Sequence, residues 1–142
     1  MRELHDALQA AGCEVAVAPD ELLRELTEGR DLGLILGLVR LPPALTLSDI
    51  LSAKDTPEQA PPLLLAAVDI VDPGNVGALT RTAHAGGAAA LLAVGASDPF
   101  HPRATRTSRG SIFKLPIVAY ETAETLLVDL RHHGIAAAGT VA

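Results

Sequence analysis

Short apolar runs alternate with stretches of helical periodicity through the second half of the chain. Continuous apolar runs bounded by turn residues predict buried strands, and apolar positions three or four residues apart predict helices. The predicted strands are Leu63–Val71, Ala88–Val94, Ile117–Tyr120 and Ile135–Val141, and the predicted helices are Asn75–Ala85 and Ala123–His133. This alternation predicts an α/β fold in which helices flank a parallel sheet.

Two polar residues are placed to begin these helices. Pro73 and Gly74 predict a turn after the first strand, and Asn75 follows where a side chain can cap the helix behind it. Thr122 is expected to cap the last helix, which has Glu124 in its first turn and basic residues in its last, as the helix dipole favours.

The first third of the chain repeats a shorter helix and strand pattern. The expected elements are a helix over residues 2–11, a strand Cys13–Ala18, a helix from Pro19 to Gly29, and a strand Leu32–Leu41 that Pro42 and Pro43 end. The polar, proline-rich stretch Ser52–Pro62 predicts a linker. We therefore expect a first segment over residues 1–51, a linker over 52–62 and the main domain over 63–142.

Composition indicates which residues form the core and which cellular compartment suits the protein. Hydrophobic residues make up 49% of the 142 residues but aromatic residues only 2%, so the core must consist of Leu, Val, Ile and Ala. The single cysteine, Cys13, excludes an internal disulfide and fits a reducing cytoplasm. No apolar run approaches the roughly 20 residues of a membrane span, and the N-terminus lacks signal-peptide features.

The net charge of −6 is unevenly distributed. Residues 1–60 carry 11 acidic and 5 basic side chains, whereas residues 61–142 carry 6 of each. A basic cluster lies between His101 and Tyr120, where no acidic residue occurs. Its members are Arg103, Arg106, Arg109 and Lys114. A nucleic-acid partner is therefore compatible with an acidic chain, because this cluster can neutralise phosphates locally.

Two motifs resemble those of a known family. Asp72-Pro73 introduces the first, which is carried by Asn75, Gly77, Arg81, Thr82, Ala83 and Gly87. It is similar to motif 1 of the SpoU (TrmH-like) RNA 2′-O-ribose methyltransferases of the SPOUT superfamily. The second, Pro102–Pro116, resembles the basic Ser-x-Gly segment of the same family.

This resemblance implies a function and a set of site residues. It implies S-adenosylmethionine as cofactor, tRNA or rRNA as substrate, Arg81 and Asn75 as catalytic residues, and Thr140 at the cofactor pocket. The implied RNA-binding residues are Arg103, Arg106, Ser108, Arg109 and Lys114. An arginine side chain rarely loses its proton in a protein, so stabilising the developing alkoxide suits Arg81 better than acting as a base.

The resemblance also implies that the chain is a fragment. Residues 1–51 resemble the end of the ribosomal-protein-like domain that often precedes the methyltransferase domain. Complete family members continue past this point into a knotted segment that supplies most of the S-adenosylmethionine pocket and the homodimer contacts. We therefore expect an incomplete knotted domain that does not methylate RNA alone.

Several alternatives remain open at this stage. One alternative is that Asn75 is a helix cap and has no role in a site. Another is that Arg103, Arg106 and Arg109, at three-residue spacing, form a solvated helix face. A Rossmann dinucleotide site is excluded, because the segment starting at Gly74 lacks the second and third glycines of its fingerprint. No metal site is expected, since adjacent His132 and His133 do not share a helix face. The rival function is a non-catalytic RNA-binding or dimerising module, or a degenerate gene product.

Overall fold

The structure is a computed structural model that describes residues 2–27, 35–53 and 62–140. Its contacts divide the chain into two units, Met1–Arg40 and Leu41–Ala142. The first unit contains helices α1 (Arg2–Ala10) and α2 (Asp20–Leu26), as expected. Where side-chain burial is described in this unit, no residue is buried.

Two predicted strands in the first third do not form. Cys13–Ala18 has no regular structure, and the same holds for residues 35–41 of the predicted strand Leu32–Leu41, whose first three residues lie outside the described ranges. A strand is stabilised by pairing and by burying one face, and these segments do neither within the described residues. The two predictions are therefore wrong for the residues that the structure describes.

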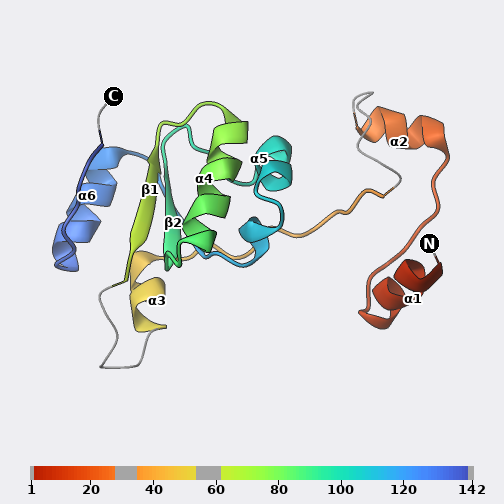
Figure 1. The fold of residues 1–142 in the computed structure, drawn as a ribbon, viewed down its shortest axis with the longest axis horizontal. Coiled ribbons are helices and arrows are strands. Elements are labelled where there is room, and N and C mark those ends of the chain that lie inside the picture. Colours follow the sequence, from red (N-terminus) through yellow and green to blue (C-terminus); the bar gives the residue numbers. More distant parts are fainter. Residues whose placement is uncertain (1, 28–34, 54–61, 141–142) are drawn as a thin grey trace. The chain divides into compact units, whose positions relative to one another are not determined.

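The second unit is built on a three-stranded parallel sheet (Figure 1). Its strands are β1 (Leu64–Val68), β2 (Ala90–Val94) and β3 (Ile117–Tyr120), in the order β1-β2-β3. Leu64 pairs with Ala90 and Val94 pairs with Tyr120, so all three strands end at one edge. The predicted α/β class with a parallel sheet is confirmed.

Helices cover both faces of this sheet. Figure 1 shows α4 and α5 on one side and α6 on the other. The elements are α3 (Leu47–Ser52), α4 (Pro73–Ala85), α5 (Pro102–Thr107), the 3-10 helix η1 (Ser111–Phe113) and α6 (Ala123–His132). The short helix α3 lies in the second unit, although the expected first segment ran to residue 51. None of the described helices is long and apolar enough to cross a membrane.

The sheet is shorter than the apolar runs suggested. β1 stops at Val68 because Asp69 adopts a left-handed conformation, with φ +51°. The predicted strand from Ile135 does not form over Ile135–Thr140, and the Ile135 amide instead donates to the Leu130 carbonyl at the end of α6. That prediction is wrong for the described residues, because the segment finds no strand to pair with there.

The two faces of the sheet carry separate cores. On one face Leu92 packs with leucines of α3 and α6, including Leu47 and Leu126. On the other face Leu91 packs with Ala67 and Ala83. β2 is buried along its whole length, so successive residues of this strand alternate between the two cores.

Candidate functional site

The first motif forms the turn and helix that follow β1. α4 begins at Pro73, whose missing amide hydrogen is not needed in the first turn. The N-cap is Asp72, which makes no capping hydrogen bond through its side chain. Asn75 lies inside the first turn and is exposed, so the prediction that it caps the helix is wrong.

The second motif packs tightly on the first through Gly77. A Cβ atom at Gly77 would collide with the Thr107 hydroxyl and the Ala104 carbonyl oxygen of α5. The Thr107 hydroxyl also lies 3.2 Å from the Gly74 carbonyl oxygen of α4, and 2.9 Å from the Arg103 carbonyl oxygen of its own helix. A glycine is required here because the backbones of α4 and α5 approach so closely.

Three arginines gather around an open depression between α4 and the basic segment. The depression has a volume of about 390 Å³ and is lined by Gly74, Ala78, Arg81, Arg106, Thr107 and Arg109. No carboxylate lines it, and all three arginine side chains are exposed. Guanidinium groups bind phosphate through paired hydrogen bonds, so this depression suits a phosphate-bearing ligand. We call it the arginine depression.

Arg109 reaches the arginine depression through an unusual backbone turn. α5 ends at Thr107, and Arg109 has φ +50°, followed by Gly110 at φ +86°. The left-handed conformation costs a non-glycine residue about 1–2 kcal/mol. Arg103, Arg106 and Arg109 therefore do not form one helix face. The first two lie on α5, whereas Arg109 lies in the turn after it.

Arg103 forms an ion pair with a carboxylate and does not line the arginine depression. Its guanidinium lies 2.9 Å from the Asp72 carboxylate, and both side chains are about half exposed. Gly74 lies beneath this pair, and a Cβ there would come within 3.0 Å of the Asp72 carboxylate and 3.3 Å of the Arg103 side chain. Lys114 is exposed after η1 and does not line the arginine depression.

Two further predicted site residues lie in unexpected surroundings. Ser108 is fully buried, and its hydroxyl donates to the Thr105 carbonyl oxygen at 2.7 Å, so in this structure it does not present a group to RNA. The serine instead supports the end of α5. Thr140 is exposed and does not line the arginine depression.

Two hydrogen bonds at the carboxyl edge of the sheet were not predicted from the sequence. The Asp69 carboxylate accepts from the Ala96 amide at 3.2 Å, and the Ser97 hydroxyl accepts from the Ile70 amide at 2.8 Å. A Cβ at Gly95 would collide with that carboxylate. These contacts tie the connection after β1 to the connection after β2, and isolated polar residues in a sequence give no signal of such pairing.

A second unforeseen network lies on the α6 side. The Tyr120 hydroxyl donates to the Asp129 carboxylate at 2.6 Å, and that carboxylate lies 3.5 Å from Nε2 of His133. His133 in turn lies 3.2 Å from the Ser48 hydroxyl of α3. The pKa of the Tyr120 phenol is raised above its usual range. Burial is the largest cause, and the hydrogen bond to Asp129 is the second. The i, i+4 spacing of Asp129 and His133 was the available signal.

Comparison with known proteins fixes the family. The model of the SpoU rRNA Methylase family matches residues 62–142, more than half of the chain, so the chain belongs to this family. It is 29% identical over 142 residues to the 23S rRNA (guanosine-2'-O-)-methyltransferase RlmB of Ralstonia nicotianae, covering 99% of this chain and 55% of that protein. It is 37% identical over 79 residues to the 23S rRNA (guanosine(2553)-2'-O)-methyltransferase RlmP of Bacillus subtilis, covering 55% of this chain and 31% of that protein.

Solved structures agree with this assignment. The AdoMet-bound rRNA methyltransferase from Sinorhizobium meliloti superposes with a TM-score of 0.71 at 25% identity, covering 92% of this chain and 47% of that one. The SpoU methyltransferase AviRb from Streptomyces viridochromogenes, in complex with AdoMet, superposes with a TM-score of 0.55 at 30% identity, covering 65% of this chain and 33% of that one. The present chain thus spans about half the length of the relatives that it matches over its whole length.

Proposed function

We propose that the protein acts in the 2′-O-ribose methylation of rRNA, with S-adenosylmethionine as methyl donor. The observation that carries this proposal is the arginine depression, in which Arg81 of the first motif lies with Arg106 and Arg109 of the second. Family membership and the activities named for the relatives support the same reaction. A cytoplasmic location belongs to this proposal, because the single cysteine is free.

Each motif would contribute a different part of RNA recognition. Arg106 and Arg109 would hold phosphates of the RNA backbone, which fixes the position of a ribose without reading bases. Arg81 would stabilise negative charge as the 2′-hydroxyl loses its proton, a role that a permanently charged guanidinium can fill. The exposed amide of Asn75 would orient the ribose. Arg103 and Lys114 would add weaker attraction from outside the arginine depression.

S-adenosylmethionine would supply the methyl group when bound. Thr140, the residue that the resemblance implies at its pocket, is exposed and does not line the arginine depression. The residues of this chain would hold the RNA backbone and the acceptor ribose.

RNA binding tests the proposal directly. The Arg106→Ala variant should weaken binding of a single-stranded oligoribonucleotide, and the slope of log affinity against log salt should flatten by about 0.7, the value for one phosphate contact. Arg131→Ala is the matched control, because it removes the same charge from an exposed position on α6. Equal effects of the two variants would show that only net charge matters and would overturn the assignment of the arginine depression.

One alternative is a non-catalytic RNA-binding module, for which the arginine depression alone would suffice. Transfer of labelled methyl groups from S-adenosylmethionine to rRNA distinguishes the two functions. Methyl transfer to rRNA would support the enzyme, and RNA binding without methyl transfer would support the module.

A further inference from the structure

We propose that His84 is a positioning residue for RNA binding, which acts by holding the turn that presents Arg109 beside Arg81. Nδ1 of His84 lies 3.1 Å from the Ser111 hydroxyl. Ser111 follows the left-handed pair Arg109 and Gly110 directly. The inference deepens the proposed function and rests on it, because the residue that His84 positions is a proposed phosphate contact.

His84 connects α4, which also carries Arg81, to η1, which begins at Ser111. His84 comes three residues after Arg81 on α4, so both side chains project from the same side of the helix. Ser111 is buried at the first residue of η1, and its amide donates to the Ser108 carbonyl at 3.0 Å. The hydrogen bond between His84 and Ser111 therefore joins α4 to the residue where the chain leaves the Arg109 turn.

The turn needs such a fixed point. A left-handed arginine is intrinsically unfavourable, and a Cβ at Gly110 would meet no atom within 4 Å, so packing at Gly110 does not hold the turn. The preceding constraint is the hydrogen bond from the Arg109 amide to the Arg106 carbonyl at 3.2 Å. The following constraint is Ser111, which His84 holds from α4. Without His84, Ser111 keeps its backbone hydrogen bond to Ser108 but loses its side-chain link to α4.

A double-mutant cycle on the 142-residue chain tests the role. We expect His84→Ala to weaken binding of a single-stranded oligoribonucleotide about threefold to tenfold and to flatten the salt slope by about 0.7, as if one phosphate contact were lost. Arg109→Ala should do the same. The double variant should be no worse than Arg109→Ala, because His84 would have no remaining contact to position. His84→Asn, whose amide can replace Nδ1, should restore binding.

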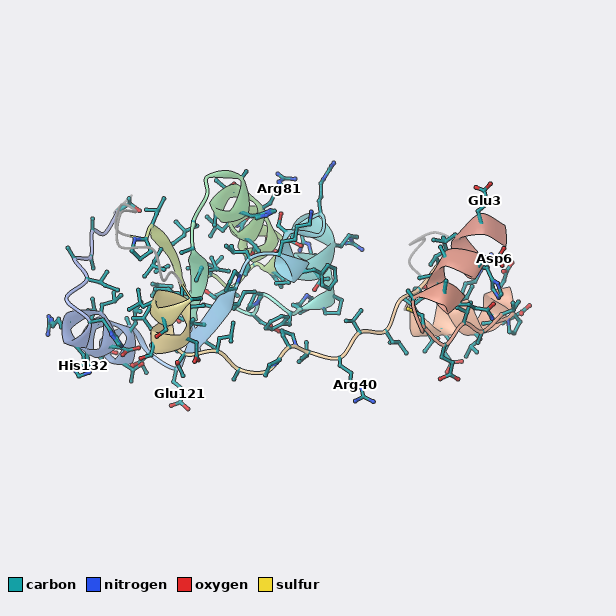
Figure 2. All side chains as sticks on the ribbon, turned by 90° about the horizontal axis from the view of Figure 1, so that it is seen from below. Glu3, Asp6, Arg40, Arg81, Glu121 and His132 are labelled. Carbon is teal, nitrogen blue, oxygen red and sulfur yellow. The ribbon has the colours of Figure 1, made fainter. Side chains whose placement is uncertain are left out.

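Three outcomes would overturn the inference. The first is additive losses in the double variant. The second is a His84→Ala variant that melts at a lower temperature but keeps the wild-type salt slope at temperatures where it is folded, since that pattern describes a purely structural residue. The third is an equal loss with His132→Ala, an exposed histidine on α6, across the sheet from Arg81 (Figure 2).

Hydrogen exchange in the free protein separates this inference from the proposed function. His84→Ala should speed exchange of the Ser111 amide relative to wild type, whereas His132→Ala should leave it unchanged. If the wild-type chain binds no RNA, the proposed function and the RNA role of His84 both fail. If it binds RNA and the Ser111 amide does not respond to His84→Ala, the positioning role alone fails.

Discussion

The two faces of the sheet are built from different kinds of contact. The α4 and α5 face uses small residues, so that helix backbones approach closely at Gly77 and Ala104. The α3 and α6 face uses leucines, among them Leu47 and Leu92. The first arrangement places arginines at a common depression, whereas the second buries more apolar side chain. One face therefore positions the arginines that we propose to bind RNA, and the other holds the larger leucine cluster.

Leucine truncation on each side of β2 compares the two faces most directly. Leu92→Ala should destabilise the fold by about 2–5 kcal/mol, toward the upper end, because Leu92 packs among large side chains of α3 and α6. Leu91→Ala should fall toward the lower end, since two of the three other buried members of its cluster are alanines and only Leu115 is large. Urea unfolding followed by circular dichroism measures both. Equal losses would contradict the claim that the α3 and α6 face contributes more.

Gly77→Ala tests the close approach on the other face. The added methyl group would collide with Thr107 and the Ala104 backbone, so α5 must shift. We expect a loss of about 1–3 kcal/mol and weaker RNA binding together, because the shift moves Arg106 away from Arg81. Gly139→Ala is the control, since a methyl group there meets no atom within 4 Å. A stable Gly77→Ala variant with unchanged RNA affinity would show that the close approach does not position the arginines.

Much of the fold could be predicted because its signals are local. The strand Ile117–Tyr120 has the predicted bounds, and Thr122 caps α6 with a capping box, because apolar runs and cap residues act within a few residues. The predicted strand at Ile135 failed, since strand formation depends on a partner that the local sequence does not specify. Asn75 was misplaced as the cap because Pro73 can already occupy the first helical turn.

The candidate site was predicted less completely than the fold. The motifs identified Arg81, Arg106 and Arg109, which the structure brings to one depression. The sequence did not reveal that Ser108 is buried, because a serine near arginines has the same sequence pattern whether its hydroxyl faces solvent or a backbone carbonyl. It also did not reveal the contact between His84 and Ser111, since that contact depends on the way α4 and η1 pack. The catalytic roles of Arg81 and Asn75 remain predictions.

Tyr120→Phe probes the polar network of the α3 and α6 face. We expect a loss of about 1 kcal/mol, because the phenol donates to a partly buried carboxylate. Since the folded state raises the pKa of Tyr120, it holds the proton more tightly than the unfolded chain. The stabilisation is therefore complete below about pH 10, the unfolded value, and declines as the pH rises above it. Unfolding between neutral and strongly alkaline pH should show a steeper decline for wild type than for Tyr120→Phe. Parallel curves would contradict this role.

The smallest expected effect concerns the charge of Asp72 beside the arginine depression. Asp72→Asn breaks the ion pair with Arg103, and because both side chains are about half exposed the loss of stability should stay below about 1 kcal/mol. The freed Arg103 should at the same time attract RNA more strongly, by about twofold to threefold at low salt. Glu124→Gln on α6 removes an equal charge on the other face and should raise RNA affinity less. Titration of both variants with the same oligoribonucleotide at low and high salt measures the difference. Identical gains would show that RNA responds to net charge alone and not to the face that carries the arginines.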